Sequence, residues 1–432
     1  MLYEDAGGDI LMALVGDSFI NRKLCVYRED RFLAIATLLR EADVSVTNAE
    51  VMFHQYEGAP VWDAGVYGTY VASEPGLIDE LKWLGIKMVA CANNHAGDYG
   101  EVGALQNIAN LDAHGMPHAG TGRTLSEAVA PEYFDTPKGR VALISVTCTV
   151  PAGGQRAGDP LGPTKGRPGA NVLRSQSVYT LPRPDFEHLR DLASRIGQQR
   201  PSEREDELTF LGQRFVLGEE LRRNTYPNQF DNDLNLKWVS DARRMADWVI
   251  VSVHCHERGA TPGELPQFAH DFARAAIDAG ADVVHGHGPH QDRAIEIYKG
   301  RPIFHALGNF IMQNDLVKWE PRDAFLRLGL DPESTPADMY DFRTGNDTRG
   351  AVTQPVQWQS AVVQVSFEDH ALKEIRLHPV DLGMTAKRSQ RGRPVLAEGE
   401  VADEILTRFQ TCSAPFGTKI EVEGCSGVIR CR

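Results

Sequence analysis

Short apolar runs alternate with amphipathic segments along residues 1–150. Runs of strand length, bounded by polar or turn-forming residues, predict buried β-strands at Ile10–Val15, Val44–Thr47, Lys87–Cys91 and Val141–Val146. Apolar positions at helical spacing predict helices between these strands, at Arg31–Ala42, Ile78–Leu84 and Val102–Ala113. Because alternating strands and helices build layered cores, we expect an α/β fold.

A second block of the chain repeats this alternation after residue 241. It predicts a helix at Leu265–Ala279 and strands at Trp248–His254, Asp282–His285, Arg293–Tyr298 and Ile303–Ala306. Since the second block resumes the pattern of the first, we expect residues 1–432 to form a single interrupted domain.

Long polar stretches separate and follow these blocks. Residues 151–241 open with Gly, Pro and Arg residues, and we interpret them as an insertion, either a substrate loop or lid or a solvated basic loop. Residues 320–355 predict a second long loop. Residues 356–432 predict two strands joined by a turn at 368–371, then an amphipathic helix and a hairpin that turns at Glu423–Gly424.

Chemically active side chains directly follow the predicted strands. Open α/β sheets bind ligands outside the carboxyl ends of their strands, so we expect these side chains to converge. They are Asp17, Glu50, Asn94, His95, His254, His256, His285, His287 and His290. Carboxylate, amide and imidazole groups in this combination favour Mn²⁺, Zn²⁺ or Fe over Ca²⁺. Because one ion needs about four ligands, the surplus favours two divalent ions bridged by Glu50.

Each of these residues also has a structural interpretation when it is taken alone. Asp17 could cap a helix or turn, Asn94 could be a turn residue, and a lone histidine is more often structural than a ligand. We assign His95 to general acid catalysis, outside the metal shell. Asp98 either holds the His95 imidazole in one tautomer or caps the helix that begins near Glu101.

The chain is acidic, with a formal net charge of −14 and a pI near 5.5. This charge opposes binding to nucleic acid or to an anionic membrane. No apolar run approaches the roughly 20 residues of a membrane span, and the acidic N-terminus does not resemble a secretory signal. The 7 cysteines contain no C-x-x-C pair, which favours a reducing compartment. We therefore expect a cytoplasmic protein.

Several motifs follow one another from Ile10 to about Ile311: GDSFINR, TNAE, ANNHAGDYG, VSVHCHERG, GADVVHGHGPH and IFHALGNFI. As an ordered set they resemble the CapA-type poly-γ-glutamate (capsule) synthesis proteins, a family of the metallophosphoesterase-like superfamily. The resemblance implies a four-layer α/β/β/α sandwich with a dinuclear metal site at the strand ends. The predicted hairpin after residue 356 would be a C-terminal extension of it.

The resemblance also implies roles for individual residues. His95 would be the catalytic histidine that is not a ligand, and the metal ligands would be Asp17, Glu50, Asn94, His254, His287 and His290. The usual phosphoesterase D-x-H motif is Asp17-Ser18-Phe19 here, so one ligand is missing. His285, His256 or His290 could complete the shell. Asn309 either hydrogen-bonds near the metals or only packs the end of its strand.

These residues support more than one function. The first hypothesis is a metal-dependent hydrolase that acts on a small anionic phosphoester or a glutamyl-type amide. The alternative is a noncatalytic accessory or binding protein for poly-γ-glutamate synthesis. An anionic substrate requires a local positive field, for which Arg22 is the first candidate. A homodimer is compatible with the sequence, which does not determine the oligomeric state.

Overall fold

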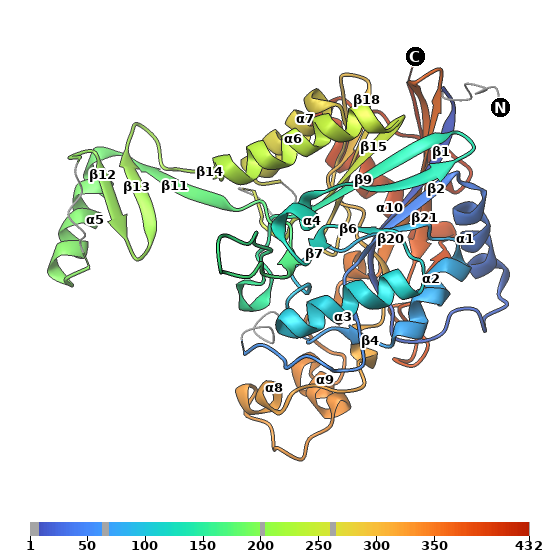
Figure 1. The fold of residues 1–432 in the computed structure, drawn as a ribbon, viewed down its shortest axis with the longest axis horizontal. Coiled ribbons are helices and arrows are strands. Elements are labelled where there is room, and N and C mark those ends of the chain that lie inside the picture. The colour runs from blue at the N-terminus through green and yellow to red at the C-terminus, as the bar shows by residue number, and fades with distance from the viewer. Residues whose placement is uncertain (1–7, 63–68, 199–203, 260–264, 432) are drawn as a thin grey trace.

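The computed structural model describes residues 8–62, 69–198, 204–259 and 265–431. Within these ranges the chain is a mixed α/β fold built on two large β-sheets (Figure 1). A smaller sheet and its helix project from this body, at the left of Figure 1. No helix among the described residues combines the length and the apolar character needed to cross a bilayer.

The larger sheet is organised around the N-terminal strand β1, which pairs in parallel with β2 and β19 and antiparallel with β20. Nearly every residue of β1 is buried, as its continuous apolar run predicts for a strand covered on both faces. The strands of this sheet are β1 (Ile10–Phe19), β2 (Val44–Ala49), β5 (Met88–Ala90), β6 (His118–Ala119), β19 (Asn309–Met312), β20 (Gln359–Glu368), β21 (Ala371–Asp381), β22 (Val395–Leu396), β23 (Glu421–Glu423) and β24 (Ser426–Arg430).

The second sheet has parallel strands at its centre, with β15 between β9 and β16. Its strands are β8 (Glu132–Thr136), β9 (Gly139–Thr147), β15 (Trp248–His254), β16 (Val283–His287), β17 (Ile295–Tyr298) and β18 (Arg301–Phe304). The first and second blocks of the sequence therefore meet in this sheet, because β9 precedes residues 151–241 and β15 follows them.

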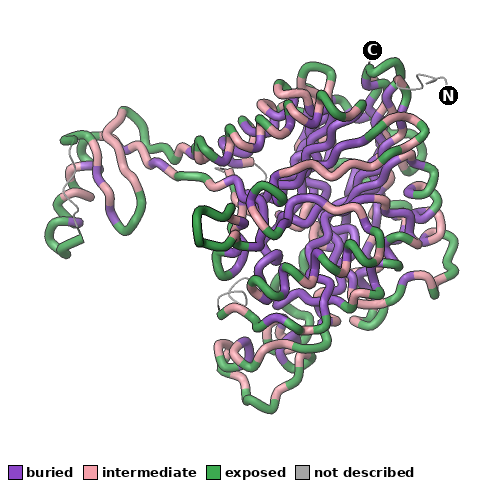
Figure 2. Tube along the Cα trace, in the orientation of Figure 1, coloured by how far each residue is buried: buried purple, intermediate pink, exposed green. Residues whose placement is uncertain are grey.

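Apolar side chains of the two sheets pack against each other in one buried cluster, which includes Leu14 and Val46 from one sheet and Leu143 and Ile250 from the other. The opposite face of each sheet is covered by helices. Helices α1 (Asp30–Glu41) and α2 (Ile78–Leu84) cover the larger sheet, and α6 (Gln229–Met245) and α7 (Gln267–Ala279) cover the second. Figure 2 shows the resulting buried interior.

The predicted helices and strands of both blocks are present, with ends displaced by a few residues. The strands β20 and β21 turn at 368–371 as predicted, but they lie beside β1 inside the larger sheet. The tail forms α10 (Gly399–Ser413) and the hairpin β23–β24. The other elements of the body are α3 (Gly100–Ala113), α4 (Leu125–Val129), β3 (Met52–Phe53), β4 (Ala72–Ser73), β7 (Thr121–Gly122) and β10 (Gly169–Ala170).

The polar stretches are more regular than the sequence predicts. Residues 151–241 include the projecting sheet, made of β11 (Ser175–Leu181), β12 (Glu207–Phe210), β13 (Gln213–Leu217) and β14 (Arg222–Pro227), with helix α5 (Arg183–Arg195). Residues 320–355 were predicted to be a loop but contain α8 (Arg322–Arg327) and α9 (Pro336–Thr344). Phe325 and Met339 of these helices bury against Tyr70 and Tyr99, which explains why this polar segment is ordered.

Trp248 begins β15 and is completely buried against the antiparallel strand β20, where its ring lies 5.1 Å from that of Phe367. We predict that Trp248→Ala lowers the free energy of unfolding by about 3–5 kcal/mol, because truncation leaves a cavity between the sheets. Urea denaturation measures this loss. Trp319 is 67% exposed, so Trp319→Ala is the control and should change stability by less than about 0.5 kcal/mol. Equal effects of the two substitutions would contradict this account of the core.

Candidate metal centre

The side chains predicted to converge lie where strands of both sheets end. In the larger sheet, parallel pairing places Asp17 of β1 beside Asn48 of β2 and Asn309 of β19. In the second sheet, parallel pairing places His254 of β15 beside His287 of β16. Register therefore sets the positions of these groups, and the packing of the two sheets brings the two sets together.

Glycine permits a close backbone approach at this point. A Cβ atom on Gly16 would lie 1.8 Å from the carbonyl oxygen of Gly308, so no larger residue fits there. Gly308 itself has φ +72°, a conformation that favours glycine. The amide of Asp17 donates to the Gly308 carbonyl at 2.9 Å, and this contact holds the Asp17 carboxylate at the end of β1.

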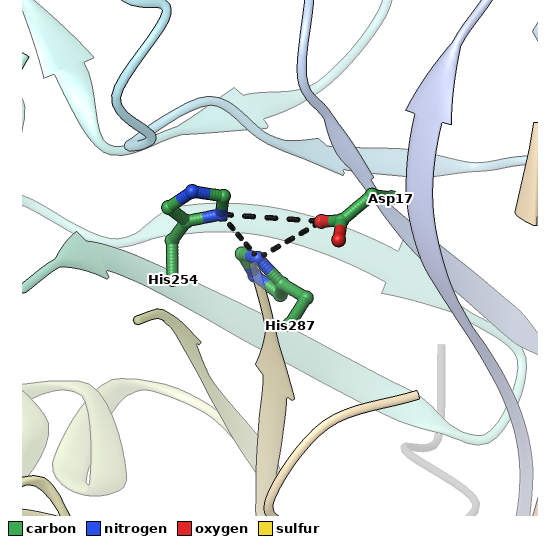
Figure 3. A group of neighbouring side chains, drawn as sticks. All are labelled: Asp17, His254 and His287. Carbon is green, nitrogen blue, oxygen red and sulfur yellow. Dashed lines mark hydrogen bonds and ion pairs between the residues drawn. The ribbon is translucent and has the colours of Figure 1, made fainter. Parts of the chain in front are cut away.

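The first group of potential ligands is Asp17, His254 and His287, all fully buried (Figure 3). Asp17 Oδ1 lies 3.5 Å from His287 Nδ1 and 3.9 Å from His254 Nδ1. The two imidazole Nδ1 atoms are 3.0 Å apart. Ligand atoms about 2.0–2.2 Å from one ion lie roughly 3.0–3.5 Å from each other, so these separations suit a shared cation.

The second group surrounds Glu50, which is fully buried. Glu50 Oε1 lies 3.5 Å from His256 Nε2 and 3.6 Å from His254 Nε2. Asn94 Oδ1 approaches the same two nitrogens, at 3.2 Å and 2.8 Å respectively. Neither carboxylate oxygen of Glu50 has a hydrogen-bond partner among the described residues. Burying an ionised carboxylate without a hydrogen-bond donor costs free energy. A bound cation would offset this cost by pairing with Glu50.

His290 connects the two groups. Its Nδ1 lies 3.5 Å from Asp17 Oδ2, and its Nε2 lies 3.9 Å from Glu50 Oε1. Asn309 Oδ1 is 2.9 Å from the same Nδ1. The backbone of His290 has φ 57°, which is uncommon for a residue with a side chain.

The two carboxyl groups differ in their surroundings. Asp17 accepts hydrogen bonds from Asn48 Nδ2 at 2.7 Å and from the Gly288 amide at 3.0 Å. Burial by itself would raise the pKa of Asp17, but the His290 hydrogen bond and neighbouring imidazoles hold it below its usual range. For Glu50, burial and the Asp17 carboxylate both raise the pKa well above its usual value. Asp17 is thus ionised in the protein alone, whereas ionised Glu50 needs a cation.

Burial favours the neutral form of three histidines of the centre, His254, His256 and His287. Burial lowers the pKa of His287 to about 3, and it also lowers the pKa values of His254 and His256. A neutral imidazole offers one unprotonated nitrogen, which is the form that coordinates a metal. The donor set and its protonation therefore fit divalent cations.

His95 stands beside the centre with one ring nitrogen occupied. Its Nδ1 lies 2.8 Å from Asp98 Oδ2, and its Nε2 lies 4.0 Å from Glu50 Oε1. The Val71 amide also donates to Asp98 Oδ2, at 2.9 Å. The N-cap of α3 is Tyr99, so Asp98 contacts the imidazole and is not the helix cap. This contact is the arrangement that fixes a histidine tautomer.

Some candidate residues lie outside these groups. The Arg22 guanidinium donates to the backbone carbonyls of Ser389, Gln390 and Arg391, so its described contacts anchor that loop and give no support to a role in substrate binding. His285 is hydrogen-bonded on both ring nitrogens, to Val15 O at 2.9 Å and to Ser252 Oγ at 3.2 Å. Of the three histidines considered for the last ligand, His256 and His290 are the ones that lie in the ligand groups.

The sequence analysis did not single out several supporting residues. Asn48 donates to Asp17 and lies 3.3 Å from His254 Nδ1, and Asn93 in turn donates to Asn48 Oδ1 at 3.2 Å. Ser252 Oγ lies 2.7 Å from His287 Nε2. Asn48 lies near the end of β2 and Asn93 follows β5, so their positions at strand ends, like those of Asp17 and Glu50, could have indicated a role.

Comparison with known proteins gives a consistent family match. The model of the family described as bacterial capsule synthesis protein PGA_cap matches residues 5–314. The uncharacterized protein y4sH of Sinorhizobium fredii is 35% identical over 97% of this chain and 92% of its own length. The capsule biosynthesis protein CapA of Bacillus anthracis is 23% identical over 70% of this chain and 58% of its own. A probable polyglutamine synthesis accessory protein of Mycobacterium tuberculosis is 25% identical over 55% and 48%.

Removing the unsatisfied Glu50 carboxylate should stabilise the metal-free protein and remove the stabilisation that bound metal provides. The pKa of Glu50 is higher in the folded than in the unfolded chain, so its favourable contribution exists at low pH and is lost as pH rises. At pH 7, Glu50→Gln should therefore raise the melting temperature of metal-free protein in EDTA. The same substitution should abolish the stabilisation by Mn²⁺, which for the unsubstituted protein is about 2.7 kcal/mol at 100-fold excess over Kd.

Differential scanning calorimetry with EDTA and with Mn²⁺ measures both effects. Glu101→Gln is the matched control, because Glu101 is exposed in the first turn of α3, and it should behave as the unsubstituted protein does. A Glu50→Gln protein that is destabilised in EDTA and still stabilised by Mn²⁺ would refute this interpretation of the centre.

Proposed function

This chain belongs to the CapA-type family of bacterial capsule synthesis proteins, and on that premise we propose that it is a metal-dependent hydrolase. Its substrate would be a small anionic phosphoester or a glutamyl-type amide. One observation carries the proposal. The buried Glu50 carboxylate has no hydrogen-bond donor among the described residues, yet four imidazole nitrogens lie 3.5–4.0 Å from its Oε1 atom.

Two ions would be held by two neighbouring groups of ligands. Asp17, His254 and His287 would hold one ion. Glu50, His256 and the Asn94 amide oxygen would hold the other. His254 lies beside both groups, but a neutral imidazole has one free nitrogen, so it would serve one ion only. His290 lies near both carboxylates and would complete the centre. When bound, divalent ions such as Mn²⁺, Zn²⁺ or Fe²⁺ supply Lewis acidity and a water of lowered pKa.

His95 would act as the general acid. Because Asp98 accepts from Nδ1–H, the imidazole presents Nε2 toward the side on which Glu50 lies. A proton on Nε2 could then pass to the leaving group as its bond breaks, and Asp98 would stabilise the imidazolium that takes part in this exchange. Asp98 itself is held by the Val71 amide, so the dyad is positioned before a substrate binds.

The layered arrangement of sheets and helices supports this proposal. We propose that the two packed sheets and the helices on their outer faces form a four-layer metallophosphoesterase-like sandwich, in one domain interrupted by residues 151–241. In this arrangement the centre lies at the carboxyl ends of strands from both sheets, where open α/β sheets bind ligands.

An accessory role without catalysis is the second candidate. It is favoured by the relative from Mycobacterium tuberculosis, which is named as a probable accessory protein of polyglutamine synthesis. A metal centre would then serve recognition, because ions that bind carboxylates of a polymer need no general acid. The contact between His95 and Asp98 favours hydrolysis over this alternative.

Activity assays distinguish the two functions. Purified protein loaded with Mn²⁺, Zn²⁺ or Fe²⁺ should hydrolyse at least one of bis(p-nitrophenyl) phosphate, p-nitrophenyl phosphate, γ-glutamyl-p-nitroanilide or poly-γ-glutamate. We predict that His95→Ala lowers kcat by about 10²–10⁴-fold and leaves the metal content unchanged, because it removes only the general acid. Asp17→Asn should lower both metal content and turnover. Plasma mass spectrometry measures the bound metal.

His114→Ala is the control, because His114 pairs with Asp79 on the surface and should leave both quantities unchanged. Turnover that survives both His95→Ala and Asp17→Asn would exclude the proposed centre as its source. Tight binding of poly-γ-glutamate, with no hydrolysis of any of these substrates, would establish the accessory role instead.

A further inference from the structure

A cavity of about 470 Å³ lies beside the second sheet. The start of α7, the end of β18 and the end of α10 with the short helix Ala414–Phe416 enclose it. Arg293, His305, Cys412 and Phe416 are among its lining residues. None of the lining residues belongs to the ligand groups built on Asp17 and Glu50.

Neighbouring side chains of β18 point to opposite faces of the second sheet. Successive side chains of a strand point to opposite faces of the sheet. Ile303 of β18 packs in the cluster beneath α7, and His305, two residues on, continues in that direction. Phe304 packs between the two sheets instead, in the layer toward which His285 turns to reach Val15 of β1.

Arg293 is the exceptional residue of this cavity. It is 1% exposed, and its Nε and Nη1 atoms have no hydrogen-bond partner among the described residues. Its Nη2 atom makes one long contact, 3.4 Å to the Glu257 carbonyl oxygen. Arg391 is buried to the same degree, at 3% exposure, but pairs with Asp315 at 2.8 Å and Asp347 at 3.1 Å.

Two acidic groups near this cavity are already paired with other cations. Glu296 Oε1 lies 2.6 Å from Arg274, and its Oε2 lies 3.0 Å from His270. Asp292 pairs with Arg408 at 3.0 Å. An arginine keeps its charge in a protein, and burying that charge without a counter-ion costs several kcal/mol. Glu257 is a further acidic neighbour that acts on Arg293 through space, but its Oε2 accepts from Thr149 Oγ1 at 2.8 Å and it forms no ion pair with Arg293. The cavity therefore adjoins a cation that has no direct carboxylate partner among the described residues.

The remaining walls are largely apolar. Leu265, Ala294, Pro415 and Phe416 line the space beside Arg293. We propose that this cavity binds a small organic anion, whose charged group lies against Arg293 and whose apolar body lies against Phe416 and Leu265. The proposal does not depend on the function of the metal centre, because it uses none of those residues.

Calorimetric titration of the full-length protein tests the proposal with benzoate, its neutral analogue benzamide, and inorganic phosphate. Benzoate should bind at least about tenfold more tightly than benzamide, because only benzoate compensates Arg293, and more tightly than phosphate, which has no apolar body. Arg293→Met should remove the preference for benzoate over benzamide, and Arg293→Lys should retain part of it. Equal binding of benzoate and benzamide, or no binding of benzoate, would overturn the proposal.

A chemical readout keeps the test valid if Arg293→Met does not fold. Cys412 lines the cavity, whereas Cys425 is exposed on the β23–β24 hairpin. Benzoate should slow the alkylation of Cys412 by N-ethylmaleimide, followed by peptide mass spectrometry, and leave that of Cys425 unchanged. Ala294→Phe, which fills the cavity and keeps Arg293, should abolish this protection. Protection that persists in Ala294→Phe, or that affects both cysteines, would overturn the proposal.

Discussion

The burial of the Glu50 carboxylate is the constraint on which the centre depends. Four imidazoles lie around its Oε1 atom, but none is close enough to donate a normal hydrogen bond. In a low-dielectric interior an unpaired carboxylate is either protonated or accompanied by a cation. The imidazole nitrogens nearest to Glu50 Oε1 lie 3.5 and 3.6 Å away, as ligands of one ion do. Without a cation, these distances leave the carboxylate without a hydrogen bond.

The positions of these ligands follow from the packing of the backbone more than from local side-chain contacts. Gly16 meets Gly308 so closely that a single methyl group would separate β1 from the segment before β19. Gly286 similarly meets the carbonyls of Phe304 and His305, at 2.4 Å and 2.5 Å from the site of a Cβ atom. Glycines therefore hold β1 and β16 at the spacing that brings Asp17 and His287 to one point. Gly16, Gly286 and Gly308 therefore contribute to the site through the backbone spacing that they permit.

Much of this arrangement could be predicted because strand ends are easy to recognise in the sequence. Asp17 and His254 each stand at the end of a long apolar run, and parallel register then fixes their neighbours. Arg22 could not be placed in this way, because its contacts are carbonyls of residues 389–391, more than 360 positions away. The projecting sheet at 175–227 was missed because its strands are short and polar, so their hydrophobic pattern resembles that of a loop. Contacts between distant parts of the chain account for the first failure, and the weak hydrophobic pattern of short polar strands accounts for the second.

The acidity of the whole chain makes local cations decisive. With a net charge of −14, the protein repels anions at long range, but this field is screened beyond about 8 Å at physiological salt. A single desolvated positive charge inside a pocket acts through a much lower dielectric constant and outweighs that repulsion at contact. Metal ions held by Asp17 and Glu50 would provide such a charge at the strand ends, and Arg293 would provide it beside the cavity near Phe416. Recognition of anions at the two proposed sites would therefore depend on cations in the interior, because the surface of the chain is acidic.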